Sequence, residues 1–333
     1  MEKPVVLITG ANGFIGSHIV DKMNQEGYHV RGLVRKSSDL SLLQGLNIEL
    51  VYGDVTEPMS LEAAVKGANV VIHNAGLASD WGPLDQFMKI NYGGTKNLAE
   101  AAEKAGVKRF VLLSSVAIHG FGTPDVMNEN SPINTQGFHY SISKWEAEKW
   151  LMDFGKSSKM EVTAIRPGNV FGPKDHTFIE NYLDILVKGQ GGYVNGGQSK
   201  TCPTYVHNLT HGIALAASHH NAPGEAFIIT DGLDINWKQF TEKLTTSLGI
   251  KNPSMSIPFG LGNFIAGNME RIYKIFNSKK APLLTKYRMN NGGKAYYFSI
   301  DKAKNMLGFV PETDLDTAIQ ETVKWYKSKH SIQ

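Results

Sequence analysis

The chain has little cysteine and no long apolar run. Its 333 residues contain a single cysteine, Cys202, which excludes an intramolecular disulfide and a multi-cysteine metal site and suits a reducing compartment. No run approaches the about eighteen apolar residues of a membrane-spanning helix, and the apolar stretch near the N-terminus is too short for a signal peptide. We therefore expect a cytoplasmic protein with no integral membrane segment.

An excess of one charge sign is also missing. The 34 basic and 31 acidic residues leave a formal charge of +3. This balance argues against a nucleic-acid partner. The eleven histidines form no close pair other than His219 and His220, so we expect no metal site either. With 41% hydrophobic and 20% charged residues, the composition is that of a globular protein of one large or two ordinary domains.

What the sequence does contain is an apolar run that turns through three glycines into a helical pattern. Val5 to Ile8 predict a buried parallel strand, and apolar residues recur at helical spacing after it. Gly10, Gly13 and Gly16 allow a tight turn, a close approach of backbone to a pyrophosphate, and packing of helix on strand. An ordinary glycine-rich turn is the alternative, but the flanking strand and helix favour dinucleotide binding.

Short β-rich runs alternate with helical patterns along the first half of the chain. The expected strands lie near residues 5–9, 28–34, 47–51, 69–73, 107–114 and 161–166. This alternation predicts an α/β protein with a Rossmann-type doubly wound parallel sheet. We expect the dinucleotide-binding domain to cover residues 1–175, with returning segments near 200–232, and a smaller, mostly helical substrate-binding region over 176–333.

The end of the second predicted strand carries positive charge. Arg35 and Lys36 are followed by Ser37, at a place where NAD-preferring enzymes have an acidic residue for the ribose 2′-hydroxyl. A basic pair suits a 2′-phosphate instead. We predict NADP as the cofactor, with NAD as the alternative. Solvated loop charges are the other interpretation of this pair.

A tyrosine and a lysine four residues apart occur twice. Tyr140 and Lys144 share one helix face, as do Tyr92 and Lys96. A nearby ammonium group favours the phenolate and lowers the pKa of a tyrosine, which makes it a usable acid or base. We choose Tyr140 because Ser115 ends the preceding strand, with room for one loop between them, whereas Tyr92 precedes that strand.

These features resemble the extended branch of the short-chain dehydrogenase/reductase superfamily. The Gly-x-x-Gly-x-x-Gly spacing, the Tyr-x-x-x-Lys pair and the Arg-Pro-Gly-Asn-Val-Phe-Gly-Pro segment at 166–173 are similar to its motifs. The resemblance implies that Ser115 hydrogen-bonds the substrate oxygen and that Tyr140 gives or takes its proton. Lys144 would perturb Tyr140 and hold the nicotinamide ribose, and Asn91 would be a fourth member of the catalytic set.

The resemblance also implies a set of cofactor contacts. Asp54, after the third strand, resembles the aspartate that contacts the adenine, and residues 74–76 resemble the segment beside the ribose. The implied cofactor-binding residues are Gly10, Asn12, Gly13, Phe14, Ile15, Gly16, Arg35, Lys36, Ser37, Asp54, Val55, Asn74, Ala75, Gly76, Tyr140, Lys144, Pro167, Gly168, Asn169 and Val170.

Residues 196–209 help to choose between two groups of this branch. Nucleotide-sugar epimerases and dehydratases carry an arginine for the diphosphate and two aspartates where this chain has Lys200, Thr201 and Asn208. Loss of the two-pronged guanidinium weakens the case for a diphosphate ligand. Residues 80–82 and 307–311 resemble instead the 3β-hydroxysteroid dehydrogenase and dihydroflavonol reductase group, and also reductases of long-chain β-keto acids.

We therefore expect an NADP-dependent oxidoreductase. It would interconvert a hydroxyl and a keto group on an apolar, hydroxysteroid-like or β-hydroxyacyl-like small molecule by hydride transfer. A nucleotide-sugar epimerase or dehydratase is the alternative. A non-catalytic dinucleotide sensor comes third, because sensors of this fold commonly lack the Tyr-Lys pair. A homodimer is left open.

Residues 258–278 predict an amphipathic helix with one apolar stripe. The stripe consists of Leu261, Phe264, Ile265, Met269, Ile272, Ile275 and Phe276. Packing within the C-terminal region is the commonest fate of such a stripe; a lid over the substrate pocket and a membrane-surface helix are the alternatives. Gly260, Gly262 and Gly267 favour a lid, because each weakens a helix by about 1 kcal/mol relative to alanine.

Overall fold

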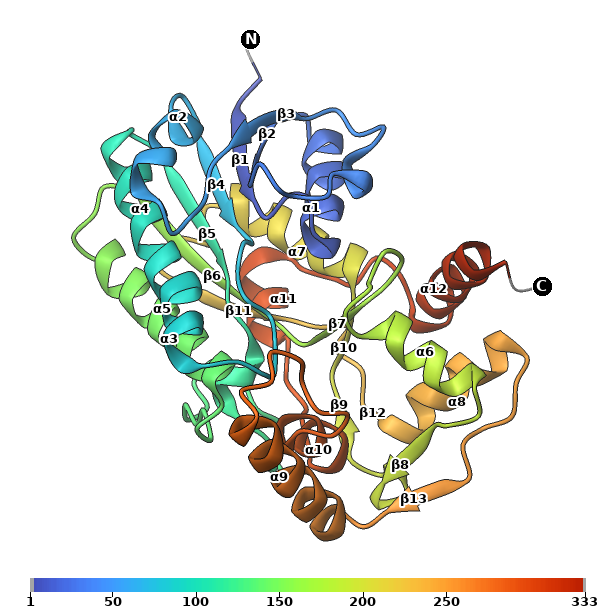
Figure 1. The fold of residues 1–333 in the computed structure, drawn as a ribbon. Coiled ribbons are helices and arrows are strands. Elements are labelled where there is room, and N and C mark those ends of the chain that lie inside the picture. The colour runs from blue at the N-terminus through green and yellow to red at the C-terminus, as the bar shows by residue number, and fades with distance from the viewer. Residues whose placement is uncertain (1–2, 332–333) are drawn as a thin grey trace.

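The computed structural model describes residues 3–331, which are organised around a seven-stranded sheet (Figure 1). The order is β11-β6-β5-β4-β1-β2-β3, and all neighbouring strands run parallel. The strands are β1 (Val5–Thr9), β2 (His29–Val34), β3 (Glu49–Tyr52), β4 (Val70–His73), β5 (Arg109–Leu113), β6 (Glu161–Pro167) and β11 (Ala226–Ile229). The predicted doubly wound sheet is confirmed, and the strand order reverses between β1 and β4, where ligands bind in such sheets.

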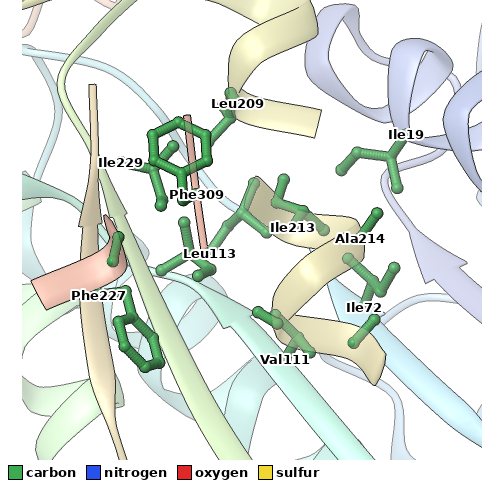
Figure 2. Packing of buried hydrophobic residues seen from close by; sticks show 14 of the residues in the cluster. Ile19, Ile72, Val111, Leu113, Leu209, Ile213, Ala214, Phe227, Ile229 and Phe309 are labelled. Carbon is green, nitrogen blue, oxygen red and sulfur yellow. The ribbon is translucent and has the colours of Figure 1, made fainter. Parts of the chain in front are cut away.

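Helices cover both faces of the sheet. One face carries α1 (Phe14–Gln25) and α7 (Val206–Ser218), and the other carries α2 (Glu62–Val65), α4 (Gly94–Lys104) and α5 (His139–Gly155). Side chains of α7 meet the strands in Figure 2, where Ile213 lies near Leu113 and Val111. Strands that are apolar on both sides are buried between the helices, so the carboxyl ends of β1, β4 and β5 form a rigid edge.

The remaining elements of the first half are short. The helix α3 (Leu84–Phe87), the π-helical turn η3 (Met88–Gly93) and α4 follow one another without interruption. The 3₁₀ turns are η1 (Ser41–Leu43), η2 (Pro58–Ser60), η4 (Val116–His119) and η5 (Asn195–Gly197). Three small pairs of strands join later segments: β7 (Asn169–Phe171) with β10 (Pro203–Tyr205), β9 (Lys200–Thr201) with β12 (Ile235–Asn236), and β8 (Gly192–Val194) with β13 (Met255–Ile257).

The C-terminal part is mostly helical. Three helices, α6 (Ile179–Val187), α8 (Trp237–Leu248) and α12 (Leu315–His330), enclose a second core. The others are α9 (Phe259–Ile275), α10 (Lys286–Gly293) and α11 (Asp301–Leu307). The chain returns to the sheet twice after residue 175. It first adds α7 to one face and β11 to the edge, and later α11 packs on the sheet. Within residues 3–331, no helix is both long and apolar enough to cross a bilayer.

The helix predicted over 258–278 forms as α9, but its apolar stripe is not core. Phe264 and Phe276 are exposed, and the buried residues of α9 are Gly262 and Ala266. The reason is the close contact with α10, since a Cβ on Gly262 would lie only 2.2 Å from the Met289 methyl group. The face with small residues packs, while most of the stripe is exposed and only Ile265 and Met269 are partly buried. The expectation that the stripe packs within the C-terminal region is therefore wrong for its exposed residues.

Candidate active site

The three glycines shape the turn between β1 and α1. Gly10 has a φ of +65°, and a Cβ there would lie 3.0 Å from the backbone of Ala75. A Cβ on Gly16 would lie 2.0 Å from the Gly10 carbonyl oxygen, so only glycine lets α1 approach the turn this closely. Gly13 precedes α1 without a side-chain cap, which leaves N–H groups of the first turn available to a phosphate.

The residues beside the turn support the same interpretation. Phe14 and Ile15 open α1, and no acidic residue in its first turn would repel a phosphate. The Asn12 amide donates a hydrogen bond to the carbonyl of Asp39 at 3.1 Å. This contact ties the glycine turn to the loop that follows β2.

The segment after β4 faces the glycine turn. The Asn74 amide donates to the carbonyl of Gly10 at 3.2 Å, and the Ala75 N–H donates to the hydroxyl that ends β1 at 3.0 Å. A Cβ on Gly76 would lie 3.3 Å from Lys144 Nζ, so a side chain here would occupy the space beside that ammonium group. The glycine turn and the segment after β4 thus lie side by side where the strand order reverses, and this segment leads to Lys144.

The basic pair lies exposed in the loop after β2. The Arg35 N–H donates to the Ser38 hydroxyl at 3.1 Å, which closes a turn that also contains Lys36 and Ser37. Neither basic side chain has an acidic partner in the part of the chain that the structure describes. Both cationic groups are therefore free to meet an anion.

Asp54 and Val55 lie just after β3. Asp54 Oδ1 accepts hydrogen bonds from the N–H and the hydroxyl of Thr56 at 2.8 and 2.9 Å. Its other oxygen has no partner within residues 3–331 and can accept from a ligand amine. Val55 is buried against Gly94 of α4, which holds the loop in place.

Ser115, Tyr140 and Lys144 come together at the carboxyl end of β5. Lys144 Nζ, buried within α5, donates to the carbonyl of Leu113 at 2.7 Å. Ser115 lies two residues beyond Leu113 and caps η4, its Oγ accepting from the Ala117 N–H at 3.1 Å. The Tyr140 phenol interacts with the Ser115 side chain. A hydroxyl, a phenol and an ammonium group therefore converge from β5 and α5.

Burial dominates the titration of this group and corrects one sequence-based expectation. Burial lowers the pKa of Lys144 to about 8 and raises the pKa of Tyr140 above its usual 10, while Ser115 partly opposes the latter. Lys144 was expected to lower the pKa of Tyr140, but the ammonium group is directed at the Leu113 carbonyl. In the chain by itself Tyr140 is a protonated phenol, which is the form that can donate a proton.

Asn91 connects the loop after β4 to α5. It lies in the π-helical turn, and its amide exchanges hydrogen bonds with the N–H and carbonyl of Leu77 at 2.7 and 3.2 Å. The amide also donates to the Ser143 hydroxyl at 2.8 Å. With these contacts Asn91 positions the loop and α5, and its nitrogen has no hydrogen left to donate to a substrate.

The second Tyr-Lys pair does not reach this place. Lys96 is half exposed on α4, lies 3.9 Å from Glu100 and is 6.0 Å from the ring centre of Trp150. The ammonium group of Lys96 is therefore engaged on the outer side of the helices. The structure brings Lys144 to the end of β5 and leaves Lys96 away from it.

The segment 167–170 links the sheet to the C-terminal part. Pro167 ends β6, and a Cβ on Gly168 would lie 2.5 Å from the carbonyl of Cys202. The Asn169 amide donates to Thr201 at 3.1 Å and to Asn291 at 3.2 Å. Val170 lies in β7, which pairs with β10. The segment is thus held beside the elements that complete the site.

Aromatic rings form a wall next to Tyr140. Phe121 has its ring centre 4.5 Å from that of Tyr296 and 5.2 Å from that of Tyr287. Phe138 lies 5.1 Å from Tyr287. Burial raises the pKa of both of these tyrosines, so their phenols stay protonated. Phe121 and Tyr296 are buried in the core, and Phe138 and Tyr287 are partly exposed against it, so the wall is an apolar cluster with phenolic edges.

Comparison with known proteins decides the family. Residues 6–230 match the NAD dependent epimerase/dehydratase family. The chain belongs to this family. It is 31% identical over 337 residues to a 3 beta-hydroxysteroid dehydrogenase/Delta 5-->4-isomerase of Mycobacterium tuberculosis, covering 97% of this chain and 90% of the relative. It is 28% identical to a mouse (Mus musculus) sterol-4-alpha-carboxylate 3-dehydrogenase, decarboxylating, covering 95% and 89%.

A solved structure agrees along the whole length. The crystal structure of gox2253 superposes with a TM-score of 0.83 at 28% identity, covering 99% of this chain and 100% of that one. The predicted membership of the extended short-chain branch is confirmed. As a member of the epimerase/dehydratase family, the chain is an NAD(P)-dependent enzyme of the dehydrogenase and reductase type.

For this family member, the residues that sequence reasoning missed are the aromatic wall and a clamp on α10. Asp80 accepts from the Thr285 hydroxyl at 2.6 Å and pairs with Arg288 at 2.8 Å, which fixes α10 and hence Tyr287 beside the site. Neither the wall nor the clamp follows a local pattern, because their members come from segments far apart in the sequence. The signals in the sequence were the likenesses of residues 80–82, 282–285 and 297–299 to the 3β-hydroxysteroid dehydrogenase group.

Proposed function

We propose that this enzyme interconverts a hydroxyl and a keto group on an apolar, hydroxysteroid-like substrate with NADP as the hydride carrier. The observation that carries the proposal is the convergence of Ser115, Tyr140 and Lys144 beside an aromatic wall. The names of the Mycobacterium and mouse relatives, both dehydrogenases of a sterol 3-position, support the same substrate class.

The cofactor supplies or accepts the hydride, and the chain supplies the proton and the orientation. In the reducing direction, the Tyr140 phenol donates its proton to the substrate oxygen, and Ser115 Oγ hydrogen-bonds the same oxygen. In the oxidising direction both transfers reverse. Lys144 gives one N–H to the Leu113 carbonyl and keeps two for the ribose hydroxyls, since an ammonium group has three donors.

The NADP preference rests on Arg35 and Lys36. Both are exposed after β2 and unpaired within residues 3–331, so they can bind a 2′-phosphate without breaking an existing contact. A guanidinium group binds phosphate through two parallel hydrogen bonds. An acidic residue at this position would repel the same group.

The nucleotide-sugar alternative has less support. Lys200, at the place of the diphosphate-binding arginine, pairs with Asp234. A lysine already paired and half exposed is a poor diphosphate clamp. Thr201 is buried and accepts a hydrogen bond from Asn169, so it cannot replace the missing aspartate.

A substrate panel tests the proposal. Purified protein would be incubated with NADP⁺ or NAD⁺ and with hydroxysteroids, hydroxyacyl compounds or nucleotide sugars, while the absorbance of reduced nicotinamide is followed. We expect reduction of NADP⁺ with a hydroxysteroid and none with a nucleotide sugar. Because an epimerase returns the hydride to its substrate and leaves this absorbance unchanged, the sugar products would be analysed separately, and conversion of a nucleotide sugar alone would contradict the proposal.

A further inference from the structure

The proposed reaction leaves the exposed apolar stripe of α9 unexplained. Phe264 is 70% exposed, Ile275 76% and Phe276 77%, and Leu261 and Ile272 are more than half exposed. At 100° per residue these side chains share one face of the helix. An apolar face of this kind on a folded chain marks a surface that something else covers.

The inner face of α9 is already fixed to the molecule. The Trp81 indole donates to the carbonyl of Ser278 at 2.9 Å and its ring contacts that of Tyr273 edge-on at 6.3 Å. Glu270 accepts from the backbone N–H of Lys286 at 2.7 Å. These anchors, together with the Gly262 contact on α10, hold the helix in place. The exposed stripe therefore belongs to a helix that is packed on the molecule, and not to an open lid.

The charge around the stripe is one-sided. Between residues 251 and 294 the only acidic residue is Glu270, although acidic and basic residues are nearly balanced in the whole chain. The basic residues of this segment are Lys251, Arg271, Lys274, Lys279, Lys280, Lys286, Arg288 and Lys294. Arg288 pairs with Asp80, but Arg271, Lys279 and Lys280 are exposed and have no acidic partner within residues 3–331.

The basic groups lie next to the apolar stripe, as is typical of a helix that lies in a membrane surface. Arg271 and Lys286 line a groove of about 270 Å³ beside Phe264, and Lys279 and Lys280 lie three and four residues after Phe276. An apolar face flanked by lysine and arginine lies flat in a bilayer surface, with its rings among the acyl chains and its cations at the phosphates. Figure 1 shows α9 at the periphery of the molecule, where a flat surface can reach it.

We propose that α9 docks the enzyme on the surface of a membrane containing anionic phospholipid. The apolar stripe enters the headgroup region and the cations around residues 271–286 contact lipid phosphates. In this orientation α10 lies between α9 and the aromatic wall, to which it contributes Tyr287. The candidate active site is then on the half of the molecule nearer the membrane. This last point rests on the proposed function; the docking itself does not.

Flotation with lipid vesicles tests the docking. The full-length protein would be mixed with vesicles of phosphatidylcholine alone or with about one-third phosphatidylglycerol. We expect flotation with the anionic vesicles, little with the neutral ones, and a loss of at least about ten-fold when the salt is raised from about 0.1 M to about 0.5 M. Absence of flotation with anionic vesicles would overturn the proposal.

Paired variants locate the surface. Phe264→Ser with Phe276→Ser, and separately Lys279→Glu with Lys280→Glu, should each reduce flotation at least about ten-fold. Met59→Ser with Val310→Ser is the matched control, because these side chains are also exposed but lie in η2 and after α11, and it should float like the wild type. Equal flotation of all variants would contradict the assignment to α9.

Two further measurements keep the outcomes distinct. Sedimentation velocity without vesicles tests whether a second copy covers the stripe; a dimer that Phe264→Ser with Phe276→Ser converts to a monomer would overturn the membrane proposal. Turnover of a detergent-dispersed hydroxysteroid tests the proposed function separately. The stripe variant should keep that turnover, and a wild type that floats without any turnover would refute the function and leave the docking intact.

Discussion

Tyr140 and Tyr92 are each followed by a lysine four residues later, yet their surroundings differ. Tyr140 lies beside Ser115 and its lysine contacts the end of β5, whereas the lysine of the other pair is engaged by Glu100. Tyr140→Phe should therefore lower kcat by about 10²–10⁴-fold through loss of the transferable proton, with little change in NADP affinity. Tyr92→Phe is the matched control and should keep full activity. An inactive Tyr92→Phe with an active Tyr140→Phe would refute the assignment.

Arg35 is the residue whose charge most directly tests the choice of cofactor. Arg35→Asp should weaken NADP binding by at least about ten-fold, because a carboxylate would replace a free guanidinium beside the 2′-phosphate. The same change should spare or improve NAD binding, since an acidic residue there accepts from the 2′-hydroxyl. Titration of both cofactors by fluorescence measures this. Equal losses for both, or no loss, would defeat the assignment.

Sequence reasoning reached the residues that act through local patterns. The glycine spacing, the strand before it and the Tyr-x-x-x-Lys order are all readable along the chain, and the structure brings Ser115, Tyr140 and Lys144 together. Their catalytic and cofactor roles remain predictions. The pKa of Tyr140 was not predictable, because it depends on burial and on the direction of the Lys144 ammonium group, which only the packing of α5 determines.

At the scale of elements, α9 shows where amphipathic patterning fails. The large apolar residues of a helix are usually taken as its buried face, but here the small residues pack and the large ones are exposed. The difference comes from α10, whose Met289 methyl occupies the space above Gly262. No sequence pattern within α9 predicts that it packs on α10, which follows it after a loop.

Substitutions on the two faces of α9 should change the free energy of unfolding by very different amounts. Gly262→Val should destabilise the fold by about 1–3 kcal/mol, because its side chain would collide with Met289. Phe264→Ala should change the free energy of unfolding by less than about 0.5 kcal/mol, since that ring is exposed. Urea unfolding of both variants measures this. A tolerated Gly262→Val with a damaging Phe264→Ala would mean that the stripe is core after all.

At the scale of the whole molecule, three buried histidines couple folding to pH. Burial lowers the pKa of His18 and of His119 to about 4 and that of His73 to about 3. Below the usual pKa of 6.5 the unfolded chain binds protons that the folded chain does not, so stability is full above that pH and falls as the pH drops toward 4.

The predicted slope is large enough to measure. Each histidine contributes about 1.4 kcal/mol per pH unit between these limits, and the three together contribute about 4 kcal/mol per pH unit near pH 5. Buried Asp231, whose pKa is raised to about 7, opposes them by about 1.4 kcal/mol per pH unit, which leaves a net slope of about 3 kcal/mol per pH unit. The free energy of unfolding, obtained from urea titrations between pH 7 and 5, gives this slope directly. A flat profile over that range would show that at least two of the three are protonated in the folded protein.

The arrangement of the first half followed from the sequence because its strands and helices alternate in a regular order. The way residues 176–331 close over the sheet did not, because it depends on contacts between distant segments. The Asp80 clamp on α10 and the aromatic wall join residues of the first half to residues near 290. Because these contacts join distant segments, the sequence predicted the reaction type more clearly than the surroundings of Tyr140.

Transfer of deuterium tests the central claim most directly. A hydroxysteroid labelled with deuterium on its carbinol carbon would be incubated with the enzyme and NADP⁺, and the cofactor and steroid would be analysed by mass spectrometry. We predict that the label moves to the reduced cofactor, that the steroid becomes a ketone, and that Tyr140→Phe abolishes both changes. An epimerase returns the hydride to its substrate. Absence of labelled reduced cofactor with the hydroxysteroid, together with inversion of a labelled nucleotide sugar that keeps its deuterium, would contradict the account.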